Sequence, residues 1–355
     1  MHINDFDYDL PEHFIAQTPI EPRDASRLLV LDKHTGAIEH RIFRDILDLL
    51  TPSDLLVLND TRVIPARLQA RKVVTGGAVE LLLLRRLNDT DWRALIGGRN
   101  VDLGMNLKLD DSDVIAEVIE VLDEGERVLR FTEPVDALVD KLGEMPLPPY
   151  IHAPLQDRER YQTVYSRDAG SAAAPTAGLH FTPELLLALR DKGVRFAYVT
   201  LHVGLGTFLP MRVENITEHR MHHEWARLLS GDAHLINQTK LQGGRVIAVG
   251  TTAARTLETA AVLSAGGDPA DAIHAPDACG WRPVIAFEAE TNLFIYPGYR
   301  WRAVDAMITN FHLPKSSLMM MISSLVGKER LFHAYEVAKA EGYRFFSFGD
   351  AMFIR

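Results

Sequence analysis

One change of pattern along the chain limits its possible folds more than any other feature. Near both ends, apolar runs that predict buried strands, such as 54–59 and 195–203, alternate with segments of helical periodicity. Between about residues 67 and 134, short β-rich runs such as 114–121 are instead separated by turn residues alone. Strands that alternate with helices favour a mainly parallel sheet, and closely spaced short strands favour a small barrel or sandwich.

We therefore predict an α/β fold, in which a domain with a mainly parallel sheet carries a smaller inserted β-barrel domain. The α/β domain is discontinuous and takes residues 1–66 and 150–355. The barrel takes residues 67–149 and ends in the proline-rich exit linker near residues 143–150.

The periodicity also places individual elements. Strands are expected at 26–32, 54–59, 195–203, 246–249, 303–309 and 344–354, and helices at 41–50, 183–192, 253–263, 316–326 and 331–340. Thr182 precedes Pro183 at one helix start, which is the order of an N-cap and a first helical proline. Gly193 is expected to end that helix.

Composition bounds the class of protein. Apolar residues make up 47% of the chain and charged residues 24%, which is ordinary for a soluble globular protein. Cys279 is the only cysteine, so no intramolecular disulfide can form and a reducing compartment is favoured. The acidic N-terminus lacks the pattern of a signal peptide, and no apolar run reaches the roughly 20 residues that span a bilayer. We expect a cytoplasmic protein with no membrane partner.

The formal net charge of −10 disfavours a general nucleic-acid coat protein, because phosphate neutralisation dominates that kind of affinity. It does not exclude an enzyme that meets a nucleic acid at one local basic patch. Arg23, Arg27, Arg62 and Arg67 are candidates for phosphate contacts, with solvated surface charges as the alternative.

Polar, turn-rich segments follow predicted strands repeatedly. They are 59–62, 174–180, 202–208, 250–252 and 309–312. In open α/β sheets, ligands bind at the carboxyl ends of the strands. These segments are therefore the predicted ligand site.

The segment 174–182 is predicted to hold a functional histidine. Gly178 gives backbone freedom beside His180, and the helix N-terminus that follows favours anionic groups. Thr176 lies in the same turn. A histidine that merely caps the turn is the alternative.

The segment 202–208 has two glycines one residue apart. Leu209 occupies the place of the third glycine of the dinucleotide fingerprint, so that fingerprint is absent. Gly204 and Gly206 indicate a close backbone approach to a nucleoside-sized ligand, or else a tight turn without a ligand.

Two further segments have a chemical interpretation. Thr251 or Thr252 is expected to cap a helix whose amides can hold a carboxylate, and Arg255 can add a bidentate contact. Ordinary capping is the alternative. In 218–224, two histidines have helical spacing, but Arg220 stands where a zinc protease has glutamate, so we predict no metal site.

Taken together, these segments resemble the S-adenosylmethionine:tRNA ribosyltransferase-isomerase family of queuosine biosynthesis. The resemblance runs from residue 8 to the C-terminus. The segments that carry it are 8–11, 24–29, 59–68, 161–165, 174–182, 202–208 and 309–315. The family carries a β-barrel domain inserted in a larger α/β domain, which agrees with the boundaries predicted above.

The resemblance implies a transferase. The family moves the ribosyl part of S-adenosylmethionine onto 7-aminomethyl-7-deazaguanine at the wobble position of tRNA and isomerises it. The products are epoxyqueuosine-tRNA, adenine and methionine. The implied partners are the tRNA anticodon stem-loop and S-adenosylmethionine, which is a consumed substrate, so no cofactor is expected. We expect a monomer.

The resemblance also suggests roles for residues. Proton transfers in this reaction suit histidine, whose unperturbed pKa is about 6.5. His180, His202 and His312 are the expected catalytic histidines, with base and acid left open, and Asp350 or Glu224 is expected to orient one of them or to hold the ribose hydroxyls. The expected substrate-binding residues are Asn59, Arg62, Thr176, Gly178, Gly204, Gly206, Thr251, Thr252, Arg255 and Asn310.

Two other classes of protein stay open on the residues alone. A methyltransferase would need a glycine-rich loop after the first strand, and residues 32–36 are a poor version of it. A module that binds RNA through the barrel is disfavoured by the net charge and by the many polar strand-end loops. The chain departs from the family pattern at Ala253, Ala254, Asn292 and 97–100. All of these positions lie outside the segments 174–182 and 202–208.

Overall fold

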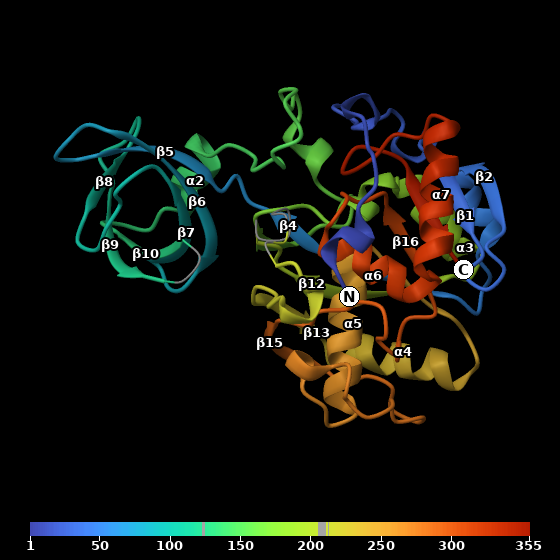
Figure 1. Cartoon of the computed structure of the whole chain (residues 1–355). Coiled ribbons are helices and arrows are strands. Elements are labelled where there is room, and N and C mark those ends of the chain that lie inside the picture. Colours follow the sequence, from blue (N-terminus) through green and yellow to red (C-terminus); the bar gives the residue numbers. More distant parts are fainter. Residues whose placement is uncertain (123–124, 205–210, 212) are drawn as a thin grey trace.

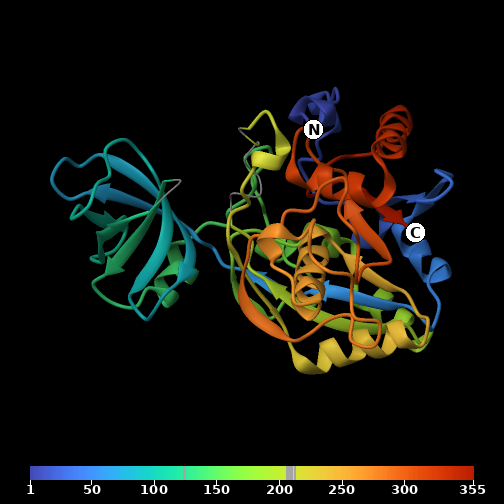
Figure 2. The ribbon, with the colours of Figure 1, turned by 60° about the horizontal axis from the view of Figure 1, so that its bottom comes forward.

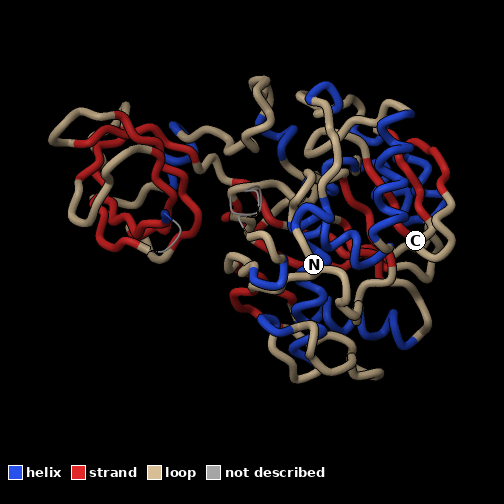
Figure 3. Tube along the Cα trace, viewed as in Figure 1, coloured by secondary structure: helices blue, strands red, loops and turns tan. Residues whose placement is uncertain are grey.

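The computed structural model describes residues 1–122, 125–204, 211 and 213–355. Figure 1 shows a small barrel beside a larger α/β body, joined by two chain crossings. Figure 3 shows that strands make up most of the barrel, whereas helices and strands mix in the larger body. The predicted α/β fold with an inserted β-barrel is confirmed.

The barrel is closed and antiparallel. Its strands are β5 (Arg67–Lys72), β6 (Ala78–Arg86), β7 (Asp91–Gly97), β8 (Asn106–Leu109), β9 (Ile115–Val121) and β10 (Glu126–Phe131), in the order β10-β7-β6-β5-β8-β9. Alternate side chains such as Leu81 and Leu83 fill its interior. Closure leaves no unpaired strand edge.

The larger body is built on a sheet of nine strands within the described residues. In spatial order they are β15 (Phe287–Thr291), β13 (Glu224–Leu228), β12 (Arg195–Leu201), β3 (Leu55–Asn59), β14 (Val246–Val249), β16 (Ala306–Asn310), β17 (Ala351–Ile354), β1 (Arg27–Leu31) and β2 (Ile38–Ile42). The central strands β12, β3, β14 and β16 are parallel, and antiparallel strands close both edges. The sheet is thus mixed, with its parallel part at the centre.

Helices cover both faces of this sheet (Figure 2). One face carries α4 (Ser230–Leu241), α5 (Thr251–Ser264), α6 (Ser317–Val326) and α7 (Lys328–Ala340), and the other carries α1 (Ile46–Leu49) and α3 (Pro183–Asp191). Each face of the sheet packs against its helices in a separate hydrophobic core. On β3, Leu55 and Val57 belong to one core, and Leu56 and Leu58 belong to the other. Fully buried parallel strands of this kind have near-continuous apolar sequences. No helix in the described ranges is both long and apolar enough to cross a membrane.

The chain enters and leaves the barrel at one place. Arg67 and Glu144 exchange two backbone hydrogen bonds there, of 3.2 and 2.8 Å. Gly143 packs so closely that a Cβ atom would lie 1.8 Å from the carbonyl oxygen of Pro65. The short helix α2 (Asp136–Leu142) ends just before this point. The predicted domain boundaries, between residues 66 and 67 and between residues 149 and 150, stay a prediction.

Three local predictions need correction. The strand expected at 344–354 is confined to Ala351–Ile354, because residues 344–350 turn at Phe346, which has a φ of 69°. The helix expected at 41–50 shrinks to Ile46–Leu49, since β2 occupies its start. α5 is not capped by Thr251 or Thr252. Gly250, with a φ of 90°, is its N-cap.

Asp91 and Arg130 form a bidentate cross-strand pair in the barrel, at 2.9 and 2.8 Å, and Arg130 lowers the pKa of Asp91 to about 2. This pair stabilises the barrel above the unfolded pKa of about 3.9 and is lost as the pH falls toward 2. Asp91→Asn should lower the melting temperature at pH 7, by a margin that shrinks below about pH 4. Asp89→Asn, at a strongly exposed pair with Arg86, is the control and should change little. A margin that does not depend on pH would contradict this account.

Candidate active site

The polar segments predicted from the sequence gather at one edge of the sheet. Because the central strands are parallel, their carboxyl ends meet there. Residues 59–62 follow from β3, 202–204 from β12, 250–252 from β14 and 310–312 from β16. The 3-10 helix Thr176–His180 packs against the end of β16.

A cavity of about 70 Å³ opens at this edge, and we call it the strand-end cavity. Its polar lining is Tyr150, Thr176, Thr251, Thr252, Thr309, Asn310, His312, Ser316 and Ser347. The described residues that line it include no Asp, Glu, Lys or Arg. The N-termini of α5 and α6 both reach it, so free N–H groups and two positive helix-dipole ends favour a carboxylate there.

A chain of hydrogen bonds runs from this cavity into the core. Thr176 Oγ1 donates to Asn310 Oδ1 at 3.0 Å. Asn310 Nδ2 donates to His180 Nε2 at 3.2 Å and to the carbonyl oxygen of Phe346 at 3.1 Å. His180 Nδ1 meets Ser26 Oγ at 2.8 Å. The Phe346 carbonyl oxygen can only accept, so the Asn310 amide nitrogen must face it. The same nitrogen donates to His180 Nε2, which must therefore be unprotonated, and the ring proton is assigned to Nδ1.

His180 is neutral in this position. Its ring is only 4% exposed and stacks on Phe43, with centroids 4.9 Å apart. Burial lowers its pKa to about 3, and the charges of Arg344 and Arg23 act in the same direction. His180 does not line the strand-end cavity and is linked to it through Asn310 and Thr176.

His312 does line the strand-end cavity. Its Nε2 atom meets Thr309 Oγ1 at 2.7 Å, and burial lowers its pKa to about 3. Two tyrosines hold its backbone: Tyr335 Oη accepts from the N–H group, and Tyr8 Oη donates to the carbonyl.

His202 lies on a second cavity, of about 320 Å³, between the barrel and the large sheet. We call it the interdomain cavity. His202 and Gly204 line it, whereas Val203 lines the strand-end cavity. The His202 ring stacks on Trp225 with centroids 4.8 Å apart, and its Nδ1 atom meets Thr61 Oγ1 at 2.7 Å. Consecutive residues of the chain therefore line two different cavities.

The surroundings of His202 tune its charge. Burial lowers its pKa, and the carboxylate of Asp168, with Oδ1 3.5 Å from Nε2, opposes that shift. Gly170 approaches so closely that a Cβ atom there would lie 2.8 Å from Nε2. Of the three histidines, His202 alone lies on the larger cavity and beside a carboxylate within the described structure.

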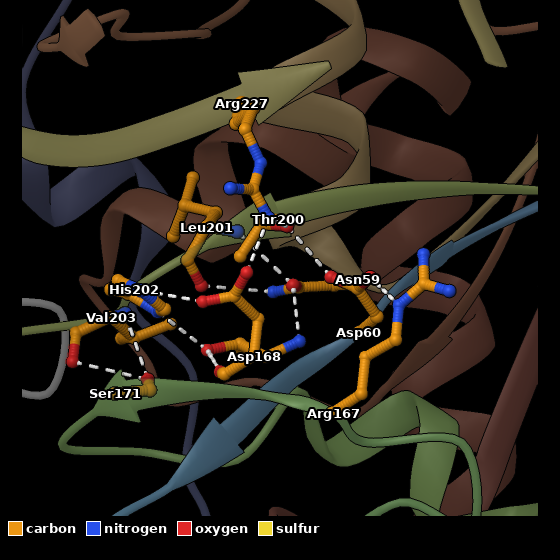
Figure 4. Close-up of polar contacts among 11 residues, drawn as sticks. Asn59, Asp60, Arg167, Asp168, Ser171, Thr200, Leu201, His202, Val203 and Arg227 are labelled. Atoms are coloured by element: carbon orange, nitrogen blue, oxygen red, sulfur yellow. Dashed lines mark hydrogen bonds and ion pairs between the residues drawn. The ribbon is translucent and has the colours of Figure 1, made fainter. Parts of the chain in front are cut away.

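Figure 4 shows the ion pairs behind this histidine. Asp168 pairs with Arg227, and Arg167 Nε donates to Asp60 Oδ2 at 2.7 Å. Thr200 Oγ1 joins the two pairs, since it donates to Asp60 Oδ1 at 2.8 Å and accepts from Arg227 Nη2 at 3.3 Å. The network ties β12 and β13 to the small parallel pair β4 (Thr61–Val63) and β11 (Asp168–Ser171).

Asn59 anchors the end of β3 rather than lining a cavity. Its Nδ2 atom donates to the Leu201 carbonyl and to Thr252 Oγ1, each at 3.1 Å. Its Oδ1 atom accepts from the N–H groups of Leu201 and Thr61, also at 3.1 Å. The side chain is fully buried and all four hydrogen-bonding positions are filled.

The two predicted substrate arginines lie outside the strand-end cavity. Arg62 pairs with Glu159 at the surface. Arg255 is buried and pairs with Glu224, which also accepts from the N–H group of Gly204 at 3.2 Å. Because Arg255 is held in this ion pair, we drop the expectation that it meets the methionine carboxylate.

Asp350 lines neither cavity. One carboxylate oxygen accepts from the Arg27 N–H group at 2.9 Å, and the other accepts from the Arg344 N–H group at 2.7 Å. Both oxygens thus accept from backbone N–H groups, and a catalytic role for Asp350 stays a prediction.

The second glycine of the segment 202–208 and the histidines of 218–224 remain to be placed. Gly206 and the rest of 205–208 lie outside the described residues. Among the residues that are described, no group of three or more His, Cys, Asp or Glu gathers as a metal ion would require. His223 precedes the strand β13 instead of lying on a helix.

Sequence reasoning misses Trp225, Arg227 and Asp168, whereas Thr61 falls within the predicted segment 59–62. The burial of Glu224–Leu228 alternates in the structure, but the sequence of this segment does not alternate between apolar and polar residues, because Glu224 occupies a buried position and Trp225 and Ala226 are both apolar. The sequence therefore gives only a weak signal for β13, which carries Trp225 and Arg227. Asp168 has no local signal, because it comes beside His202 through the pairing of β11 with β4.

The fold and the cavities define an α/β enzyme class whose ligands bind at the carboxyl ends of parallel strands, with a barrel beside the site. The family model described as "Queuosine biosynthesis protein" matches residues 3–354. The chain is 52% identical, over the full length of both chains, to the S-adenosylmethionine:tRNA ribosyltransferase-isomerase of Acetivibrio thermocellus.

A crystal structure of S-adenosylmethionine tRNA ribosyltransferase from Thermotoga maritima is also similar. It is 40% identical with a TM-score of 0.55, and the match covers 99% of this chain and 100% of that one. The protein belongs to the queuosine biosynthesis protein family.

Gly178 leaves no room for a side chain. A Cβ atom there would lie 2.1 Å from Tyr165 Oη and 2.8 Å from Thr163 Cγ2. Gly178→Ala should destabilise the protein by about 1–3 kcal/mol, because overpacking forces buried neighbours apart. Gly231→Ala in α4 has open space around it and is the matched control, expected to be neutral or slightly stabilising. Equal melting temperatures for Gly178→Ala and Gly231→Ala would contradict the steric argument.

The charge of His180 can be measured directly. Because its folded pKa is about 3 and the unfolded value about 6.5, the folded state binds fewer protons and loses stability as the pH falls below about 6.5. Nitrogen-15 spectra of histidine-labelled protein should show a neutral Nδ1–H ring from about pH 8 to 5. His180→Gln assigns the signals and should reduce the loss of stability on acidification. A titration of this ring near pH 6.5 would refute the assignment.

Proposed function

We propose that this protein is an S-adenosylmethionine:tRNA ribosyltransferase-isomerase. It transfers the ribosyl part of S-adenosylmethionine to 7-aminomethyl-7-deazaguanine at the wobble position of tRNA and isomerises it, releasing adenine and methionine and leaving epoxyqueuosine-tRNA. The observation that carries the proposal is the junction at Val203, where an uncharged cavity adjoins a larger one that holds His202. Such a junction suits a reaction between two unlike ligands, and the names of the relatives point to the same pair.

The strand-end cavity is the proposed site for S-adenosylmethionine. The N–H groups at the starts of α5 and α6 suit the methionine carboxylate, while Thr176 and Asn310 offer a hydroxyl and an amide to the nucleoside. The sulfonium is a cation, and the described lining presents no Lys or Arg to repel it. At about 70 Å³ the cavity is below the roughly 300 Å³ typical of ligand sites, so binding must displace part of the wall.

His202 is the proposed proton carrier on the tRNA side. The attacking amine must be uncharged, and a neutral imidazole can take its proton. Burial lowers the pKa of His202 and so favours the neutral imidazole, and Asp168 stabilises the imidazolium once it forms. His312 is the proposed partner for proton transfers on S-adenosylmethionine, because it lines that cavity. His180 acts through Asn310.

S-adenosylmethionine is consumed in this reaction, so we propose no separate cofactor. We also propose that the protein is a cytoplasmic monomer. A tRNA substrate and a single cysteine, Cys279, fit a reducing compartment that contains tRNA.

The reaction can be tested by its products. Incubation with S-adenosylmethionine and an anticodon stem-loop that carries the precursor base should release adenine and methionine in equal amounts. His202→Gln should slow the release by about 100-fold or more, which is the usual effect of losing an acid–base group. His274→Gln, at an exposed histidine in the same body, is the control and should keep full activity.

Other products would replace the proposal. S-adenosylhomocysteine would indicate methyl transfer. Stem-loop binding without any turnover would indicate an RNA-binding module.

A further inference from the structure

The interdomain cavity brings opposite charges from the two bodies together. Arg85 on β6 and Arg93 on β7 come from the barrel, and Glu290 on β15 comes from the large sheet. Both arginines approach the same carboxylate oxygen: Arg85 is in direct contact, and Arg93 Nη1 is 3.9 Å away. Two guanidinium groups thus share one carboxylate. An anion that enters the cavity can replace the Glu290 carboxylate on either arginine.

An aromatic wall lies next to this group. Trp225 on β13 is half-buried and lines the cavity. It is the register partner of Glu290 in the β13–β15 ladder, so the two side chains are on the same face of the sheet. Two further groups contact the indole: the ring of His202 stacks on it, and the guanidinium carbon of Arg227 lies 5.2 Å from its ring centroid. The cavity therefore offers an indole, the guanidinium groups of three arginines and the imidazole of His202 within one space, together with three carboxylates. The arginines are Arg85, Arg86 and Arg93, and the carboxylates are those of Glu126, Glu224 and Glu290.

These groups fit the parts of a nucleotide. Bases of single-stranded RNA stack on aromatic side chains, and their phosphates pair with arginine. The volume of about 320 Å³ falls within the roughly 300–1,000 Å³ of small-ligand sites. By contrast, the described lining of the strand-end cavity has no arginine for a phosphate.

We propose that the interdomain cavity binds one nucleotide of a single-stranded RNA loop, with the base against Trp225 and its phosphate on Arg85 and Arg93. The inference rests on the proposed function and deepens it, since it assigns the tRNA side of the reaction to both bodies of the molecule. The bound base is placed beside His202, one residue from the cavity proposed for S-adenosylmethionine.

Glu290 is then a competitor of the phosphate. While the cavity is empty, Glu290 holds Arg85 and Arg93 in place across the boundary between the bodies. RNA binding must break at least one of these pairs. Removing the negative charge of Glu290 should therefore strengthen RNA binding, although it weakens a contact between the two bodies.

Binding of the anticodon stem-loop, labelled with a fluorophore, tests the inference without turnover. Arg85→Ala/Arg93→Ala should weaken binding by at least tenfold and lower the slope of log Kd against log salt by about 0.7 for each phosphate that the protein no longer neutralises. Trp225→Ala should weaken binding by about tenfold, and Trp225→Phe should restore most of the affinity. Glu290→Gln should tighten binding about threefold or more, because an exposed charge pair of this kind is weak and the freed arginines gain a phosphate.

Matched controls lie elsewhere on the surface. Arg71→Ala removes an exposed arginine of β5 that pairs with Asp110, and Trp281→Ala removes a tryptophan that is 68% exposed. Both should bind the stem-loop as the unmodified protein does. A fully double-stranded RNA of equal length should compete poorly, because its bases cannot enter the cavity.

The outcomes separate this inference from the proposed function. If adenine is released but the Arg85→Ala/Arg93→Ala and Trp225→Ala variants bind the stem-loop normally, the nucleotide site is wrong. It is also wrong if Glu290→Gln weakens binding, or if double-stranded RNA competes equally. If the variants behave as expected but no adenine is released, the RNA site stands and the proposed reaction fails.

Discussion

The amide of Asn59 is the constraint on which the rest of the site depends. Its four hydrogen bonds join the end of β3 to the backbone of Leu201, to Thr61 and to the hydroxyl of Thr252. Those three partners lead respectively to His202, to the chain that enters the barrel, and to the first turn of α5. A buried amide with every position filled can adopt few other arrangements, because an unpaired polar group in the core is costly. One side chain thus sets the spacing between both cavities.

Burial divides the histidines according to what they can do. His180 and His312 are desolvated to the point where the charged form is strongly disfavoured. His202 is also shifted toward the neutral form, but Asp168 partly offsets the effect, and the ring borders the larger space. A group that must gain and lose a proton needs this kind of balance. A histidine that only has to present a lone pair to an amide, as His180 does, can be buried completely.

The sequence predicts the fold class and the edge of the sheet at which the site lies, because strand and helix periodicities are local and the carboxyl-end rule is general. It also predicts Thr176, Thr251, Asn310 and His312 as members of one region, and these residues do share a cavity. It does not predict the partners of Asp350 and Arg255, which are the N–H group of Arg27 and the carboxylate of Glu224 and are distant in sequence. Trp225 is missed for the same reason, since its importance comes from lying across a strand ladder from Glu290. Pairings of this kind are set by tertiary structure, which periodicity does not encode.

The paired backbone of Arg67 and Glu144 has a mechanical consequence. Because both chain crossings are bonded together at this point, the two covalent links to the barrel form one short pivot, and Arg158 of the large body donates beside it to the carbonyl oxygens of Asp140 and Gly143. A turn of a few degrees about such a pivot moves nearby atoms little and distant atoms more. A rotation of the barrel about this pivot would move its arginines relative to Glu290 and would require no change in the register of β3, β12 and β14. The fold in this way separates a part that can adjust to a bulky polymer from a part that must hold reacting atoms still.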